Sequence, residues 1–201
     1  MDLFERLRTN QTRYDLTVCI LSLANRLGSL ERILKELRYQ SQKYKVQVLY
    51  LGDNKAMKVG EKRNAVLSLA EGVYITFIDD DDTIAPNYIE KIMGAMESKP
   101  DVITFQVRKF FENVYSRTHV YRKDSGPIHR NPRNRLQEFH EPDHLCVWKR
   151  SIIREAFPPK SLHEDHNWAD KMNKHINTIV DIPEELYYYN FSRIDSETQG
   201  R

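Results

Sequence analysis

The sequence has few of the features that mark secreted and membrane proteins. It contains two cysteines, Cys19 and Cys146, which are too few for a disulfide framework and have no metal-ligand spacing. No apolar run approaches the roughly 20 residues of a transmembrane helix, and the N-terminal "MDLFERLRTNQTRYD" lacks the apolar centre of a secretory signal. We therefore expect a soluble, cytoplasmic protein with reduced thiols and no membrane partner.

A large excess of charge is also absent, because the net charge is only +2 over 201 residues. With 40% apolar and 30% charged residues, the chain is suited to one globular domain with a real core. The basic residues are unevenly placed, however, since the segment from Arg108 to Arg135 holds eight Lys or Arg and only two acids. Cations clustered beside an otherwise acidic body are typical of phosphate contacts, and a solvated basic hairpin and loop is the alternative.

Strand-like and helix-like segments alternate over the first half of the chain. Such alternation implies right-handed crossovers and a mostly parallel, doubly wound sheet. Ligands of these sheets bind beyond the carboxyl ends of the strands, where Asp53 and the aspartates from Asp79 to Asp82 fall. The expected strands are 16–23, 46–51 and 73–78, and the expected helices are 29–40, 60–72 closed by Gly72, and 87–99.

The second half of the chain has a different pattern. Residues 101–123 alternate as longer, half-exposed strands, which predicts a hairpin turning near Glu112 and Asn113. Residues 124–141 are loop-like because of their glycine, prolines and many charges. A helix over 164–175 and a late strand over 186–191 complete the expected elements.

Four consecutive aspartates, 79–82, follow the third strand in the stretch "YITFIDDDDTIAP". Neighbouring like charges raise one another's pKa and repel, so an unoccupied cluster of this kind is destabilising. A calcium loop is disfavoured, since its sixth position is Ile84 rather than glycine and a strand precedes it. A solvated acidic turn remains possible, but carboxylates holding Mg²⁺ or Mn²⁺ against a diphosphate explain the cluster better.

The segment "EGVYITFIDDDD" resembles the "DxD" region of the GT-A glycosyltransferases of family 2. The segments "VLYLGDN", "GEKRN", "CVWKRSIIREAFPP" and "HEDHNW" agree with that family in order and spacing, so that the resemblance covers roughly residues 16–191. It implies an α/β, GT-A-like fold with a Rossmann-related, mostly parallel sheet, flanking helices and a C-terminal acceptor-side part. It also implies one domain over 1–201, with a nucleotide-sugar-binding half (about 14–105) and an acceptor-binding and catalytic-base half (about 106–195).

The same resemblance implies the roles of particular residues. Asp81 would bind Mn²⁺ or Mg²⁺, and Asp165, with Glu164 beside it, would be the catalytic base of an inverting transfer from a nucleotide sugar, with a UDP-sugar as the expected donor. The late stretch "YYYNFSRIDSE" has no histidine where the family often has a metal ligand. The residues expected to contact the nucleotide sugar are Ser22, Asn25, Arg26, Asp53, Asn54, Arg63, Asp79 and Asp80.

The acceptor is left open by the resemblance, because the family glycosylates lipids, polysaccharides, proteins and other acceptors. A short chain without a membrane anchor resembles phage-type members, some of which decorate modified DNA bases. In a DNA reading, Arg130, Arg133 and Arg135 would follow the backbone, and Trp148 and Trp168 would either offer a stacking face to the acceptor or belong to the core. A carbohydrate acceptor, a nucleotidyltransferase and a non-catalytic nucleic-acid-binding module are the alternatives, and the oligomeric state is open.

The histidines at 140, 144, 163 and 166 raise the question of zinc. His140 and His144 bracket Pro142, so no helix would present both to one ion. We therefore interpret these histidines as solvated or acceptor-side residues.

Overall fold

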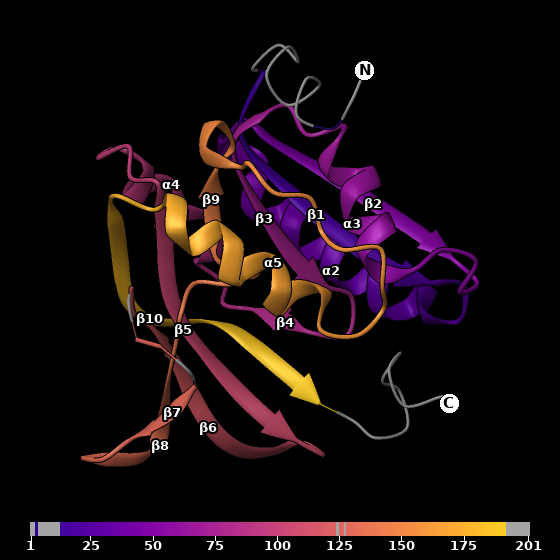
Figure 1. Cartoon of the computed structure of the whole chain (residues 1–201). Helices are drawn as coiled ribbons and strands as arrows, with labels where there is room; N and C mark the ends of the chain where they lie inside the picture. Colours follow the sequence, from indigo (N-terminus) through magenta and orange to yellow (C-terminus); the bar gives the residue numbers. More distant parts are fainter. Residues whose placement is uncertain (1–2, 4–12, 124, 127, 192–201) are drawn as a thin grey trace.

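The computed structural model describes residues 3, 13–123, 125–126 and 128–191. Among these residues, ten strands form a single mixed sheet (Figure 1). Strands β1 (Tyr14–Leu23), β2 (Val46–Asp53) and β3 (Gly72–Asp79) are parallel, with β1 between the other two. The short β9 (Val147–Lys149) pairs antiparallel with both β3 and β5 (Val102–Phe111) and so joins the two halves of the sheet.

The remaining strands extend the sheet beyond β5. The order there is β5, β6 (Val114–Tyr121), β8 (Asn134–His140) and β7 (His129–Asn131), so that β7 is the edge strand farthest from β2. Strand β10 (Ile179–Phe191) runs parallel to β5 and also pairs with the two-residue β4 (Thr83–Ile84). This last pairing ties the loop of four aspartates to the C-terminal half of the chain.

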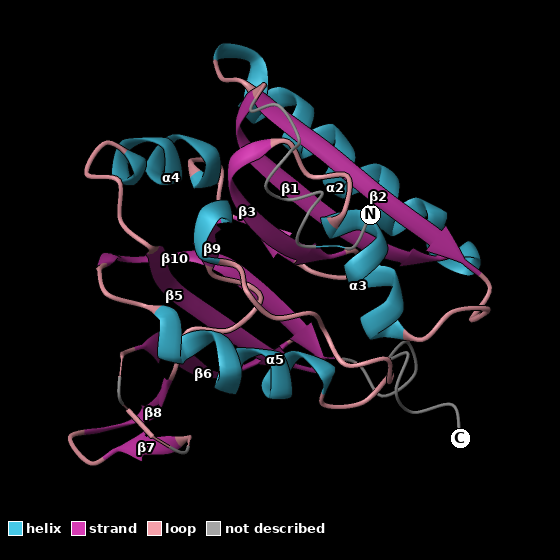
Figure 2. Ribbon diagram, turned by 45° about the horizontal axis from the view of Figure 1, so that its top comes forward, coloured by secondary structure: helices cyan, strands magenta, loops and turns pink. Residues whose placement is uncertain are grey.

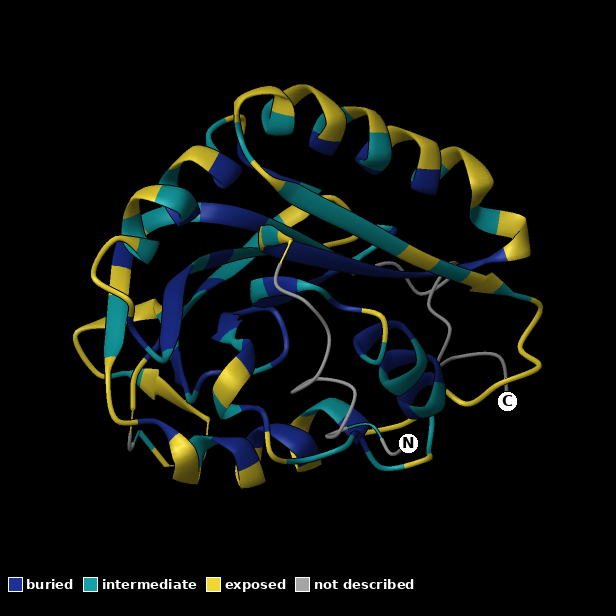
Figure 3. Ribbon diagram, turned by 90° about the horizontal axis from the view of Figure 1, so that it is seen from above, coloured by how far each residue is buried: buried dark blue, intermediate teal, exposed yellow. Residues whose placement is uncertain are grey.

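Helices cover both faces of the sheet (Figures 2 and 3). Helices α2 (Leu27–Gln40) and α4 (Tyr88–Met96) contact each other on one face, and α3 (Val59–Leu67) and α5 (Glu164–Met172) contact each other on the opposite face. Within the described part of the chain, no helix is long and apolar enough to cross a membrane. Short 3₁₀ turns lie at Ala24–Arg26, Ser41–Lys43, Arg150–Ile152 and Asn173–His175.

The sequence patterns explain these elements locally. In α2, the buried residues Leu30, Ile33 and Leu37 recur at helical spacing and face the sheet. Strand β1 is buried from Leu16 onward, as expected for a strand covered on both faces. The hairpin turn at Glu112 and Asn113 is confirmed, and both residues adopt the left-handed conformation (φ 47° and 63°) that a tight hairpin requires.

Two sequence-based expectations about these elements were wrong. The helix predicted over 60–72 ends at Leu67, and Gly72 begins β3 instead of closing the helix. A Cβ atom on Gly72 would lie 2.4 Å from the backbone nitrogen of Thr17, so glycine is needed there for β3 to approach β1.

The second error concerns residues 124–141, which were expected to form a loop. They contain the β7–β8 hairpin, whose β8 pairs parallel with β6. The many arginines and asparagines hid this hairpin, because edge strands lack the apolar alternation that marks half-buried ones. Asp124 lies outside the described residues, as do residues 192–195 of the predicted acceptor half.

Candidate active site

The carboxyl ends of three parallel strands bring the predicted polar residues to one edge of the sheet. On β1, Leu21 pairs with Asp79 of β3 and Leu23 pairs with Asp53 of β2. Ser22 lies between Leu21 and Leu23 on β1. This is the edge at which open α/β sheets bind ligands.

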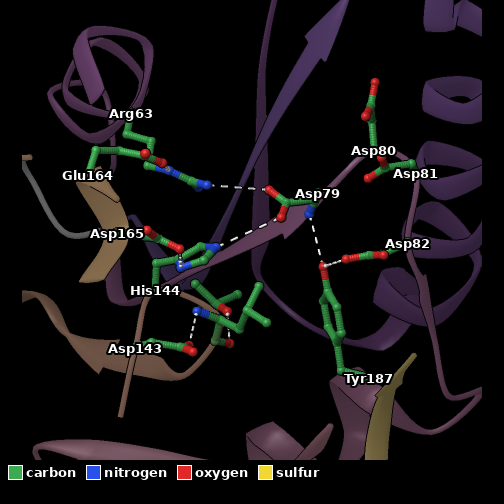
Figure 4. A network of polar contacts seen from close by, with 12 residues as sticks. Arg63, Asp79, Asp80, Asp81, Asp82, Asp143, His144, Glu164, Asp165 and Tyr187 are labelled. Atoms are coloured by element: carbon green, nitrogen blue, oxygen red, sulfur yellow. Dashed lines mark hydrogen bonds and ion pairs between the residues drawn. The ribbon is translucent and has the colours of Figure 1, made fainter. Parts of the chain in front are cut away.

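Two of the four consecutive aspartates are held by hydrogen bonds inside the protein, and Figure 4 shows the one between Asp82 and Tyr187. The buried Asp80 carboxylate accepts hydrogen bonds from Ser22 Oγ (2.6 Å) and from Arg26 Nη1 (2.9 Å). The buried Asp82 carboxylate accepts from the Tyr187 hydroxyl and from the Asn190 backbone N–H, each at 2.7 Å. These contacts fix the loop, whereas the side chains of Asp79 and Asp81 remain 28% and 33% exposed.

Asp79 ends β3 and lies between two basic side chains. Its carboxylate is 3.5 Å from Arg63 Nη2 and 3.8 Å from His144 Nε2, and its backbone N–H donates to the Tyr187 hydroxyl (3.0 Å). Burial would raise the pKa of Asp79, but His144 and Arg63 outweigh it and lower that pKa to about 2. Asp79 is therefore ionised at neutral pH.

For Asp81, the interactions that raise the pKa outweigh those that lower it. Burial, followed by the charge of Asp79, raises the pKa of Asp81 to about 6, although the guanidinium of Arg26 opposes this shift from 2.9 Å. A nearby cation stabilises the ionised form of a carboxylate whose pKa is raised by burial and a like charge. Asp79 and Asp81 therefore fit a hard divalent ion, which takes carboxylate oxygens as ligands.

Helix α5 presents Glu164 and Asp165 at its N-terminus, where the helix dipole favours acids. His163 precedes it in the left-handed conformation (φ 57°) and turns the chain into the helix. The two acids differ in exposure: the side chain of Glu164 is 7% exposed and accepts from Arg63 Nε (3.3 Å), whereas that of Asp165 is 30% exposed. Only Asp165 is therefore accessible to a substrate hydroxyl without breaking an ion pair with Arg63.

The pKa of Asp165 is held well below its usual range. Burial would raise it, but a hydrogen bond with His166 and the nearby charges of His144 and Arg63 lower it further than burial raises it. Its carboxylate lies 3.6 Å from His144 Nδ1. Asp165 is thus ionised at neutral pH, which is the state a catalytic base needs.

A cavity of about 380 Å³ connects these groups. It adjoins a second cavity of about 660 Å³, which is lined by Asn25 and shares Arg26 and Asp81 with the first. Of the residues predicted from the sequence, those lining the first cavity are Arg26, Arg63, Asp79, Asp80, Asp81, Glu164 and Asp165.

Most of the chain, including its carboxylate loop, also matches a known family. The profile described as "Glycosyl transferase family 2" matches residues 4–157, which is more than half of the sequence. The chain belongs to glycosyl transferase family 2. The matched range includes the four aspartates and ends before Glu164 and Asp165.

Solved structures of S. aureus TarS share the fold of this family 2 chain. The structure of TarS residues 1–349 has a TM-score of 0.55 at 17% sequence identity, covering 88% of this chain and 60% of that one. The same protein in complex with UDP-GlcNAc gives a TM-score of 0.57 at 16% identity, covering 92% of this chain and 60% of that one. This chain therefore spans about three fifths of those TarS chains, and no curated protein matches its sequence.

The sequence-based interpretation of the histidines as solvated is wrong for His140, which is 8% exposed, and for His144, the central residue of the site. His144 is buried and bridges the two carboxylates of the family 2 site, with Nε2 toward Asp79 and Nδ1 toward Asp165 (Figure 4). Burial and Arg63 lower the pKa of His144, but Asp79 and Asp165 outweigh them and raise it. No spacing in the sequence links these three residues, so only the fold could bring them together.

Tyr187 was likewise missed, because it was read as an ordinary strand residue. Its hydroxyl both donates to Asp82 and accepts from the Asp79 backbone. Its position in β10, opposite Ile84, explains why the aspartate loop depends on the C-terminal strand.

The two tryptophans proposed as acceptor contacts lie in the core instead. Trp148 and Trp168 are each 1% exposed, and their indole N–H groups donate to backbone carbonyls of Asp143 and Glu155. Trp168 stacks on Phe157 with ring centroids 4.5 Å apart. Neither ring can stack on an acceptor, so this expectation is corrected, and their role is to seat α5 on the sheet.

Several other predicted residues lie outside both cavities. Asp53 is occupied within its own loop, since its carboxylate accepts from Lys62 Nζ (3.0 Å) and the Met57 N–H (2.8 Å). Asn54 is exposed beside it. Arg130, Arg133 and Arg135 are exposed on the β7–β8 hairpin, at the far edge of the sheet (Figure 1).

Proposed function

We propose that this chain is a metal-dependent, inverting glycosyltransferase that moves a sugar from a nucleotide-sugar donor to an acceptor hydroxyl. One observation carries the proposal beyond the family match. A single cavity gathers the carboxylates of Asp79 and Asp81, from the first half of the chain, with that of Asp165, from the second half. The two groups of carboxylates suit the two tasks of this reaction, which are diphosphate stabilisation and proton removal.

A UDP-sugar is the donor we propose. TarS, which shares the fold, has been solved with UDP and with UDP-GlcNAc. Asp79 and Asp81 would hold Mn²⁺ or Mg²⁺, which when bound offsets the charge of the leaving diphosphate. Arg26 and Arg63 line the same cavity and add fixed positive charge to it.

Asp165 is the catalytic base in this proposal. Its carboxylate takes the proton of the acceptor hydroxyl while that oxygen forms a bond to the sugar C1, and the bond from C1 to the diphosphate oxygen breaks. A single displacement of this kind inverts the anomeric centre. Glu164 acts as a positioning residue, since it holds Arg63 and through it Asp79.

For the acceptor we propose a carbohydrate hydroxyl first and a hydroxymethylated base of phage DNA second. The DNA reading depended on the basic segment 108–135, and six of its eight cations make internal contacts. Arg108 contacts Glu185, Arg117 contacts Glu138, Lys109 lies over Tyr189, and Arg122 lies over Phe139. Lys123 Nζ donates to the Ile176 carbonyl (2.8 Å), and Arg130 Nε lies 4.0 Å from Glu138 Oε1. The phage-type origin of this chain stays a prediction.

A donor panel tests the proposed reaction. The full chain is incubated with Mn²⁺ and each of several UDP-sugars, and released UDP is measured with and without simple sugar acceptors. We expect slow UDP release without acceptor, stimulation by the right acceptor, and loss of both on chelation. Release of pyrophosphate from a nucleoside triphosphate, with intact UDP-sugars, would instead indicate a nucleotidyltransferase, and no turnover of any donor would favour a binding module.

A further inference from the structure

Three side chains with metal-binding groups lie together on the outer part of the sheet. They are His119 on β6 and Glu138 and His140 on β8. The parallel register pairs His119 with Glu138 and Tyr121 with His140. Because paired residues and residues two apart on a strand share one face of a sheet, the three side chains project to the same side. None of them lines the cavities that contain Asp79 and Asp81.

The separations between the ligand atoms are close to those of a metal site. Nε2 of His119 and Nε2 of His140 each lie 3.7 Å from the same Oε2 atom of Glu138. One ligand atom from each residue lies within 4.8 Å of the others. Zinc bonds of 2.0–2.2 Å in tetrahedral geometry place ligand atoms about 3.4 Å apart. The imidazoles are stacked with centroids 4.0 Å apart, so binding of one ion by both nitrogens would require the rings to tilt out of this stack.

Both Nε2 atoms are buried and have no hydrogen-bond partner among the residues that the structure describes. At 3.7 Å, the Glu138 oxygen is too far for a hydrogen bond to either nitrogen. His140 is only 8% exposed, so water does not readily satisfy it. Unsatisfied buried nitrogens are rare in native proteins, and an ion or water bound between them is a usual explanation.

The charge state of the two histidines suits metal binding. Burial, together with the neighbouring His140, Lys109 and Arg117, lowers the pKa of His119 to about 2. Burial also lowers the pKa of His140, although Asp143 and Glu138 oppose it. Both imidazoles are therefore neutral at pH 7, which is the form that binds metals.

The other oxygen of Glu138 is already occupied. Arg117 Nη1 donates to Oε1, and Arg130 Nε lies 4.0 Å from the same oxygen. This leaves Oε2 turned to the two histidines, and hydrogen bonds to the second oxygen of a ligating carboxylate commonly orient it. The neighbouring arginines repel any divalent ion alike, so the choice of metal is set by the ligands, and two imidazoles favour zinc and similar transition metals over Mg²⁺, Ca²⁺ or Mn²⁺.

We propose that His119, Glu138 and His140 form a binding site for zinc or a similar divalent transition metal, with water in the fourth position. The ion would clamp β8 to β6. Four residues after His140 the chain reaches His144, so the clamp would also fix the segment that delivers His144 to the carboxylates. This site is separate in position and in ligand type from the proposed Asp79 and Asp81 site.

Cobalt provides a direct probe of this site. The metal-free full chain is titrated with Co²⁺, whose visible absorption is strong in tetrahedral sites with nitrogen ligands and weak in octahedral oxygen sites. We expect strong bands that saturate at a single equivalent and disappear when Zn²⁺ is added. The bands should be lost in His119→Gln and in His140→Gln, and retained in Asp81→Asn and in His175→Ala, which removes an exposed histidine.

Folding is checked by circular dichroism and by thermal melting in chelator. If the glutamine variants do not fold, competition in the wild-type chain decides: Zn²⁺ should displace Co²⁺ while excess Mg²⁺ does not. Absence of tetrahedral bands in the wild-type chain would overturn the proposal. So would bands that survive both glutamine substitutions, bands that vanish in Asp81→Asn, or bands that Mg²⁺ removes.

Discussion

At the scale of single residues, four neighbouring aspartates of identical chemistry have four different environments. Asp80 is held by Ser22 and Arg26, and Asp82 by Tyr187 and Asn190, whereas Asp79 is ionised beside Arg63 and Asp81 remains strained. The division follows from the direction in which each carboxylate leaves the end of β3. Each of the four aspartates therefore has its own role, and the cluster does not act as one unit.

Asp53 provides a residue-scale prediction about stability. Lys62 is fully buried and its ammonium contacts the Asp53 carboxylate at 3.0 Å. Asp53→Asn should lower the free energy of unfolding by about 2 kcal/mol at pH 7, because a buried ammonium then loses its carboxylate partner. Chemical denaturation measures this, with the exposed Asp15→Asn as the matched control. An equal stability of both variants would contradict the role of this pair.

The same pair fixes the sign of a pH effect. Burial would raise the pKa of Asp53, but hydrogen bonds from the Met57 N–H and from Lys62 lower it below 3.8. The contribution of Asp53 to stability is therefore present above pH 3.8 and is lost as the pH falls through the lowered pKa. The stability difference between wild type and Asp53→Asn should shrink below that pH. UDP affinity of the folded variant, measured by calorimetry, separately tests the predicted contact of Asp53 with the nucleotide.

The acids of α5 should differ in their kinetic effects. Asp165→Asn should lower kcat by about 10²–10⁴-fold with little change in UDP affinity, because a base acts on the acceptor. Glu164→Gln is the matched control: it should affect donor binding more, since it releases Arg63 from its ion pair. Turnover at the wild-type rate in Asp165→Asn would remove that residue from the mechanism.

At the scale of elements, the proposal that the acceptor is DNA depends on the β7–β8 hairpin. Its three exposed arginines lie at the edge of the sheet, beyond both cavities. If they bind a nucleic acid backbone, duplex binding must weaken steeply with salt through counterion release. If the hairpin is only a solvated edge, its cations serve to discourage another strand from pairing with the sheet edge.

Replacing Arg130, Arg133 and Arg135 together with Ala tests the hairpin. In the DNA reading, the slope of log affinity against log salt should fall by about one unit per arginine, with donor hydrolysis unchanged. Fluorescence anisotropy with a duplex measures this, and the control replaces Lys35, Arg38 and Lys43, exposed cations at α2. No duplex binding by the wild-type chain at low salt would leave the carbohydrate acceptor.

At the scale of the whole molecule, one sheet joins the two chemical tasks. Strand β10 pairs with β5 and with β4, so the C-terminal strand supports the aspartate loop. Helix α5, which packs on one face of the sheet, presents Asp165. Ligand binding across this arrangement should therefore stabilise the entire fold.

Melting curves measure that coupling. Mn²⁺ with UDP at about 100 times Kd should raise Tm by roughly 5–10 °C, which corresponds to about 2.7 kcal/mol in a chain of this size. Asp81→Asn should lose most of this shift, whereas Asp170→Asn, an exposed acid on α5, should keep it. An unchanged wild-type curve in saturating Mn²⁺ and UDP would count against the proposed function.

The sequence by itself determined the α/β fold class, the first three strands and the family. These features depend on local patterns: apolar runs of strand length, helical spacing such as Leu30, Ile33 and Leu37, and a short carboxylate motif after a buried strand. It also identified the residues at the strand ends, because parallel strands bring their carboxyl ends to one edge.

Only the tertiary structure decided how those residues are used. His144 meets Asp79 and Asp165 across long stretches of chain, and Tyr187 reaches Asp82 because β10 pairs with β4. The burial of Trp148 and Trp168, and the gathering of His119, Glu138 and His140, depend in the same way on packing and strand register. Such contacts join residues distant in sequence, and a local pattern carries no information about which distant partner will be packed against it.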